Sequence, residues 1–122
     1  MNVVLWIGQG LLAGLFLVSG VLKSTQTVEQ MLATGQTAAK IVPLRYMRVA
    51  GVSELFGVLG LVLPWWTGIA RALTPVAAVG FVILMVLAAR VHARLREPRN
   101  VAGNLVILTV AALVAAGRFA GL

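Results

Sequence analysis

The chain contains no cysteine. This absence excludes disulfide bonds, thiolate-ligated clusters and thiol nucleophiles. Acidic residues are nearly as scarce, since only Glu29, Glu54 and Glu97 are present, and the single histidine, His92, cannot supply both axial ligands of a haem. The sequence also shows no metal-ligand cluster and no nucleotide-binding loop. We therefore expect no metal site, and an enzyme that acts alone is the weakest functional class.

Long apolar stretches make up most of the chain. Of the 122 residues, 61% are hydrophobic and 11% are charged, and the mean hydropathy is +1.02. A helix needs about 20 apolar residues to cross about 30 Å of hydrocarbon. Stretches near this length occur at residues 3–22, 47–63, 72–89 and 101–117. We predict an all-α integral membrane protein, a four-helix bundle that forms a single domain over residues 1–122 in the lipid bilayer.

The first apolar stretch, Val3–Leu22, has some features of a secretory signal. However, no Lys or Arg precedes it, its apolar run is too long, and residues 19–23 contain no small-x-small cleavage site. We expect it to be retained as the first membrane helix.

The polar segments that connect the apolar stretches also contain helix-capping and turn motifs. Thr27 and Gln30 match a capping box before apolar residues at helical spacing. This pattern predicts a short interfacial helix between the first two membrane helices, ending near Gly35. The segment Pro64–Gly68 is expected to form a tight turn whose two indoles lie in the headgroup layer.

Basic residues are concentrated on one side of the predicted topology. The net charge of +7 would suggest nucleic acid in a soluble protein, but here topology accounts for it, and no nucleic-acid partner is expected. The cations in or beside the first and third connections are Lys23, Lys40, Arg45, Arg48, Arg90, Arg94, Arg96 and Arg99. Only Arg71 and Arg118 fall on the other side. The positive-inside rule then predicts a multi-pass protein of the plasma (inner) membrane with both termini external.

Glu54 is the only acidic residue inside an apolar stretch. A charge within a bilayer is costly unless a partner or a water-filled cavity satisfies it, so Glu54 is the first candidate for function. Gly51 and Gly57 share its helical face, and small residues let helices approach closely. We expect Glu54 to point into the bundle. Gly10 and Gly14 form a small-xxx-small pair that is expected to pack within the bundle before forming a homo-oligomer seam.

Several polar side chains are expected to lie at the same depth in the membrane as Glu54 or to face the interior of the helix bundle. Arg48 is excluded as its intrahelical partner, because six residues turn a helix by about 240°. The candidate site residues are Lys23, Asn104, His92, Gln9 and Phe16. Lys23 and Glu54 could form a structural ion pair that fixes helix register, or part of a ligand or proton site. His92 is more typical of an interfacial residue than of a ligand, and Ser19 is expected to bond the preceding helical turn.

Three segments resemble the DoxX-like family. They are residues 16–23 (FLVSGVLK), 51–57 (GVSELFG) and 60–64 (GLVLP). The resemblance covers nearly the whole chain and implies a four-helix membrane protein. The family is named for a subunit associated with a quinone-linked oxidase, and some relatives are described as parts of membrane oxidoreductase assemblies. A quinone or lipid-like cofactor and a membrane redox partner are therefore what the resemblance implies.

Two functional hypotheses stand ahead of the standalone enzyme. The first is a binding or accessory protein that holds a quinone-like or lipid-like molecule near Glu54 or docks on a membrane oxidoreductase. The second is a small proton-coupled exporter of cationic compounds, in which Glu54 alternates between proton and substrate. Against the exporter, Glu54 has a lysine within expected reach, and the uneven charge distribution opposes the antiparallel pairing of very small exporters.

The charge distribution gives a direct test of topology. A reporter enzyme fused after Leu122 should be active on the external side, and the loop at residues 94–99 should be shielded from external labelling reagents, because the cations hold that side in the cytoplasm. A cytoplasmic C-terminus would contradict the prediction.

Overall fold

The computed structural model describes residues 1–122, and every regular element in it is helical. The helices long and apolar enough to cross a membrane are α1 (Asn2–Thr25), α3 (Leu44–Thr67), α4 (Leu73–Arg94) and α5 (Pro98–Phe119). Two short elements, α2 (Val28–Ala33) and the 3₁₀ helix η1 (Thr37–Lys40), lie between α1 and α3. The all-α, four-helix prediction is confirmed, and each membrane helix is longer than the apolar stretch that predicted it.

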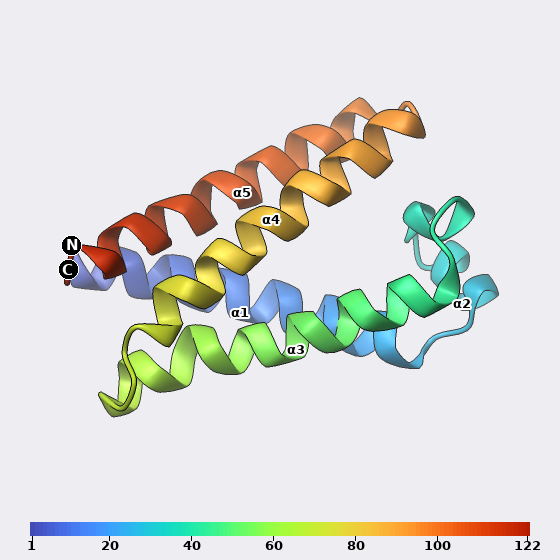
Figure 1. Cartoon of the computed structure of the whole chain (residues 1–122). Coiled ribbons are helices and arrows are strands. Elements are labelled where there is room, and N and C mark those ends of the chain that lie inside the picture. The colour runs from blue at the N-terminus through green and yellow to red at the C-terminus, as the bar shows by residue number, and fades with distance from the viewer.

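The long helices form two pairs, α1 with α3 and α4 with α5 (Figure 1). Both chain termini and the α3–α4 turn lie at one end, which we call the terminal end. Residues 26–43 and the α4–α5 turn lie at the other, which we call the connecting end. The pairs meet near the terminal end and diverge toward the connecting end (Figure 1). At the terminal end α5 approaches α1 closely because residue 117 is a glycine and has no Cβ atom. A Cβ atom on Gly117 would lie only 2.7 Å from Leu5 Cδ1.

The apolar core lies where the two pairs meet. The rings of Phe16 on α1 and Phe81 on α4 stack with centroids 4.1 Å apart and planes 14° from parallel. The other buried members of this core are Leu12, Leu61, Ala78, Met85, Ala111, Val114 and Ala115. Leu, Val and Ile side chains cover the outward helix faces, such as Ile7, Leu59 and Leu113. An apolar exterior around helices that satisfy their own backbone hydrogen bonds suits a lipid bilayer, so the chain is an integral membrane protein.

The short helix between α1 and α3 begins as its capping pattern predicted. The Gln30 amide donates to the Thr27 hydroxyl at 3.2 Å, and the Thr27 amide donates to Gln30 Oε1 at 3.0 Å. These two bonds satisfy amides that a helix start leaves free. The helix ends at Ala33, and Gly35 follows with a φ of +88°, a left-handed conformation that glycine adopts without strain.

The turn between α3 and α4 lies later than expected. Residues 64–68 were predicted to form it, but α3 continues through Pro64 and both tryptophans to Thr67. Gly68 ends the helix with a φ of +76°, and its amide bonds the Pro64 carbonyl. A membrane helix continues through such residues because backbone groups in lipid must be paired within the protein, and proline is tolerated there.

Glycines divide into two groups by their surroundings. A Cβ on Gly51 would lie 2.7 Å from Lys23 Cβ, and one on Gly57 would lie 2.6 Å from Phe81 Cζ. These glycines therefore let α3 approach its neighbours. Gly10 and Gly14 differ, because a Cβ on either would meet nothing within 4 Å. The expectation that this second pair packs within the bundle is wrong, since α1 and the α4–α5 pair diverge.

This contrast predicts different responses to added methyl groups. Gly51→Ala should lower the free energy of unfolding by about 1–3 kcal/mol, because the new Cβ overlaps Lys23 Cβ and approaches the Gly20 carbonyl to 3.0 Å. The control is Gly103→Ala on α5, where a Cβ meets nothing within 4 Å. The control should be neutral or stabilising, because alanine is the better helix former. Thermal melts in mild detergent measure both, and equal melting temperatures would contradict the predicted close approach.

Candidate functional site

Glu54 lies in a polar cluster between α1 and α3. The residue is almost fully buried, at 1% relative exposure. Lys23 Nζ lies 3.3 Å from each carboxylate oxygen, and the Ser19 hydroxyl donates to Oε1 at 2.9 Å. The prediction that Ser19 bonds the preceding turn is therefore wrong, because a buried carboxylate is a stronger acceptor than a backbone carbonyl already bonded within the helix.

Close packing of α1 on α3 brings these side chains together. A Cβ on Gly20 would lie 2.9 Å from the Gly51 carbonyl oxygen, so the two backbones are nearly in contact there. Lys23 and Glu54 each follow their glycine by three residues, which places both side chains close to this contact. At the end of α1, Arg48 Nη1 donates to the Lys23 carbonyl at 3.0 Å. Arg48 thus positions the end of α1 and does not bind Glu54.

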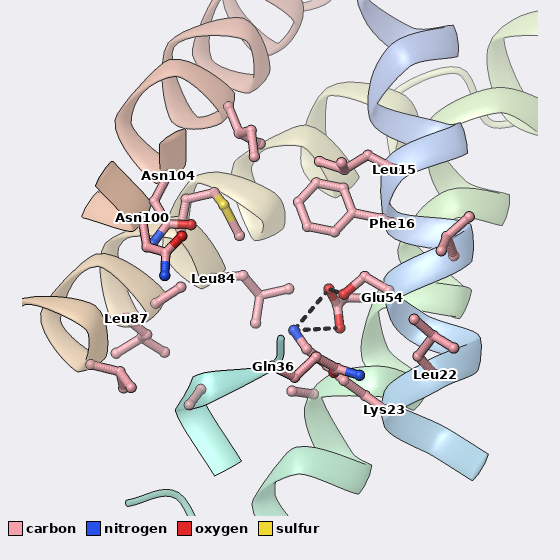
Figure 2. Close-up of a pocket in the computed structure, with 18 of the residues that line it drawn as sticks. Leu15, Phe16, Leu22, Lys23, Gln36, Glu54, Leu84, Leu87, Asn100 and Asn104 are labelled. Atoms are coloured by element: carbon pink, nitrogen blue, oxygen red, sulfur yellow. Dashed lines mark hydrogen bonds and ion pairs between the residues drawn. The ribbon is translucent and has the colours of Figure 1, made fainter. Parts of the chain in front are cut away.

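A cavity of about 1000 Å³ separates the two helix pairs beside this cluster. Figure 2 shows Phe16 and Leu84 pointing into it from opposite sides, with Lys23 and Glu54 on one wall. Most lining residues are hydrophobic. Gly10 and Gly14 also line it, which explains why nothing packs against them. The cavity therefore combines an apolar interior with a localised polar group.

A second polar group lies across the cavity. Asn100 and Asn104 extend from the start of α5, opposite Glu54 and Lys23 (Figure 2). Asn104 Nδ2 is enclosed and has no hydrogen-bond partner within the chain. Glu54 Oε2 is likewise enclosed and has no hydrogen-bond partner, although Lys23 is close enough to pair with it electrostatically. One free donor and one free acceptor thus lie on different walls.

Glu97 links the two helix pairs at the connecting end. Its Oε1 accepts from the Thr37 hydroxyl at 2.7 Å and lies 2.8 Å from His92 Nδ1. These contacts join η1 to the α4–α5 turn. The hydrogen bonds from His92 and Thr37 lower the pKa of the Glu97 carboxyl below its usual value. Because the folded pKa is lowered, the contact stabilises the fold above pH of about 4.3 and is lost on acidification.

The predicted site residues fall into two groups. Phe16, Lys23, His92 and Asn104 line the same cavity as Glu54. Gln9 does not, because it lies at the terminal end, where its Nε2 donates to the Leu61 carbonyl at 2.8 Å and its Oε1 accepts from Arg118 at 2.7 Å. Gln9 is fully buried and does not line the cavity beside Glu54.

Sequence reasoning missed several polar residues. Ser19 lies one helical turn before Lys23, and this spacing was a usable signal that it faces Glu54. Gln36 lines the cavity from the segment between α2 and η1, which has no regular spacing that predicts its direction. Arg118 was assigned only to topology, yet it is 2% exposed. The seven-residue spacing of Asn104, Ala111 and Arg118 was a usable signal, because it places Arg118 on the same helix face as the buried Ala111.

Comparison with known proteins identifies the family. A sequence profile described as the DoxX-like family matches residues 7–114, which is most of the chain. The protein belongs to the DoxX-like family. This match includes the α1 and α3 segments that carry Lys23 and Glu54. Searches of curated proteins and of solved structures found no match.

The ion pair predicts energetic coupling between α1 and α3. Glu54→Gln and Lys23→Met should each destabilise the DoxX-like protein by about 1–3 kcal/mol, since each leaves a buried or half-buried charge without its partner. The double variant should lose less than the sum, with a coupling of about 0.5–3 kcal/mol. Thermal or chemical unfolding in mild detergent measures the cycle.

Glu29→Gln provides a matched control, because Glu29 is an exposed acid on α2. It should leave stability within the experimental error of the parent protein, as exposed substitutions usually do. Strictly additive effects of Glu54→Gln and Lys23→Met would show that the two charges do not interact.

Proposed function

We propose that this DoxX-like protein is a binding or accessory membrane protein whose cavity holds a slender apolar molecule with a hydrogen-bonding head. A quinone-like or lipid-like molecule has this chemistry. The observation that carries the proposal is the cavity of about 1000 Å³ beside Glu54, with a mostly hydrophobic lining and polar groups on two walls. Ligand sites in proteins commonly have this volume and this combination of apolar lining and few polar groups.

The unpaired polar atoms support a ligand head between the two walls. A buried amide donor without a partner costs about 1–3 kcal/mol, and Asn104 Nδ2 is such a donor. A carbonyl or hydroxyl oxygen on the ligand would satisfy it. Lys23 Nζ provides a second donor on the opposite wall, and Glu54 Oε2 can accept from a hydroxyl. These groups favour a head with at least one acceptor oxygen.

The remaining lining supports an apolar tail. Leu11, Leu15, Val18 and Leu87 line the cavity, yet about half or more of each side chain is exposed at the protein surface. The cavity is therefore bordered by apolar residues that face the lipid. A tail can lie between α1 and the α4–α5 pair and reach the bilayer without crossing a polar surface. Such access suits a ligand that is itself dissolved in the membrane.

The contacts of Glu54 favour binding over proton-coupled export. In the exporter hypothesis the carboxylate must release one cation to take up another. Here Lys23 and Ser19 occupy the carboxylate from the neighbouring helix, and α1 and α3 are packed too closely to separate without repacking. In the orientation proposed from the cation distribution, the cavity faces the cytoplasmic half of the plasma membrane. A site there also fits a role beside a membrane oxidoreductase.

A cavity-filling variant tests the proposal most sharply. In Gly14→Leu the added Cβ meets no atom within 4 Å and the rest of the side chain extends from a cavity wall, so the fold should persist while the ligand is excluded. Gly103→Leu is the matched control, because a Cβ there also meets nothing and Gly103 does not line the cavity. Mass spectrometry of molecules extracted from purified protein should show one quinone or lipid species depleted only in Gly14→Leu.

Polar variants give an independent measurement. Glu54→Ala and Asn104→Leu should both lower the amount of the same bound species, because each removes a group that would contact its head. Thr109→Val, on an exposed position of α5, should not. If folded protein carries only bulk membrane lipids, in amounts that none of these variants changes, the proposed binding role is wrong.

A further inference from the structure

Buried polar atoms that lack a partner are concentrated at the Glu54 cavity. Six enclosed side-chain atoms of the chain have no hydrogen-bond partner. Three of them belong to residues that line this cavity, and they are Glu54 Oε2, Gln36 Oε1 and Asn104 Nδ2. Buried polar groups in folded proteins are normally paired. The three unpaired atoms therefore indicate which hydrogen bonds a molecule in the cavity has to supply.

Gln36 presents an acceptor to the cavity, because its donor is already used. Its Nε2 donates to Gln26 Oε1 at 2.7 Å, which ties the amide to the residue that ends α1. This bond leaves Gln36 Oε1 as the unpaired atom. In Figure 2, Gln36 lies toward the Lys23 and Glu54 side of the cavity, and Asn104 lies across it. An amide oxygen only accepts hydrogen bonds, so Gln36 needs a donor from outside the chain.

Glu54 presents a second acceptor on the same side. Its Oε1 accepts from Ser19 and Lys23, whereas Oε2 has only the electrostatic contact with Lys23 Nζ at 3.3 Å. A hydroxyl that donates to the carboxylate of an ion pair forms a short, charge-assisted hydrogen bond. The unpaired atoms of the lining are thus two acceptors, from Glu54 and Gln36, and one donor, from Asn104.

The other polar groups of the lining do not change this balance. Ser19 and Lys23 both donate to Glu54. Spare protons of Lys23 can bond a hydroxyl oxygen or a carbonyl oxygen equally well, so they do not discriminate between these heads. The remaining polar lining residues are either bonded within the chain or exposed, and they are His92, Tyr46 and Asn100. The choice between a donating and an accepting head therefore depends on Glu54 and Gln36.

Carbonyl and hydroxyl heads differ in how many of these atoms they can satisfy. A carbonyl oxygen only accepts, so a head with two carbonyls can pair with Asn104 but leaves Gln36 Oε1 and Glu54 Oε2 unpaired. A hydroxyl group both donates and accepts, so two hydroxyls can donate to both acceptors while one of them accepts from Asn104. Sites that bond a hydroxyl reject analogues without it, because the buried partner then stays unpaired.

We infer that the cavity selects a membrane-dissolved molecule whose head has two hydroxyl groups and discriminates against the dicarbonyl form of the same head. This inference rests on the proposed binding role and narrows the class of ligand. The apolar tail lies along the hydrophobic lining, which includes Phe16 and Met85. A dihydroxy aromatic ring and the glycerol head of a monoacylglycerol both have the required chemistry, and the experiment distinguishes these sources.

Two probes that differ only in the head test the selection. Decylhydroquinone has two hydroxyls, and decylbenzoquinone has two carbonyls at the same positions. Each is titrated into the full chain in phosphatidylcholine nanodiscs, and native mass spectrometry measures the apparent Kd as a concentration in the bilayer. The reductant that maintains the hydroquinone does not alter the protein, because the chain has no cysteine. The hydroquinone should bind about 100-fold tighter, about tenfold for each acceptor.

Variants assign the selection to its residues, with the ratio of the two affinities within each variant as the readout. Gln36→Met removes one acceptor and should lower the ratio about tenfold. Glu54→Gln should lower it at least as much, because the new amide can donate to a carbonyl. Glu29→Gln, an exposed position on α2, is the matched control and should keep the parent ratio. If circular dichroism shows that a variant does not fold, the two affinities of the parent protein decide.

A third probe, monodecanoylglycerol, separates the sources. Binding of the hydroquinone alone assigns the site to an aromatic head, binding of the glycerol lipid alone assigns it to a lipid head, and binding of both assigns recognition to the hydroxyls themselves. Benzoquinone that binds as tightly as the hydroquinone, or more tightly, overturns the inference and leaves the proposed binding role intact. If none of the three probes binds, the binding role fails together with the inference.

Discussion

The need to satisfy polar side chains inside a lipid-facing protein organises both ends of this molecule. At the connecting end, Glu54 is held between Lys23 and Ser19, which joins α1 to α3. At the terminal end, Gln9 bonds both the Leu61 carbonyl and Arg118, which joins α1 to α3 and α5. Hydrocarbon offers no hydrogen bonds, so each group is paired within the chain or left for a ligand. These contacts fix α1 against its neighbours while the outward faces remain apolar.

The same contacts determine where the molecule is closed and where it is open. The terminal end draws three helices together, whereas the Glu54 cluster joins only α1 and α3. The α4–α5 pair is therefore free to diverge toward the connecting end, where Glu97 provides a polar contact to η1. The cavity follows from this asymmetry. It lies between one helix pair fixed by an ion pair and another whose facing amide, Asn104, has no partner in the chain.

Length and helical period were enough to predict the four membrane helices and to place Glu54 inside the protein. The pairing of Lys23 with Glu54 was also expected. In a helix, residue number sets both the depth of a side chain in the membrane and the face on which it lies. The roles of Gly10 and Gly14 were not predictable, since a small residue fits a close contact and a cavity wall equally well. Helical spacing places Arg118 on the same face as Asn104 and Ala111. Its contact with Gln9 on α1 was not predictable, because no local pattern encodes a bond between residues 109 positions apart.

We propose that the space beside Glu54 is a ligand site and not a gap that bulk lipid fills. A photoreactive amino acid at position 15 would probe the cavity, and one at position 17 would probe the lipid, because both leucines are similarly exposed on α1 but only Leu15 lines the cavity. After irradiation in native membranes, mass spectrometry identifies what each position captures. Specific binding predicts one discrete quinone-like or lipid-like adduct at position 15 and a mixture of bulk lipids at position 17. The same mixture at both positions would contradict it.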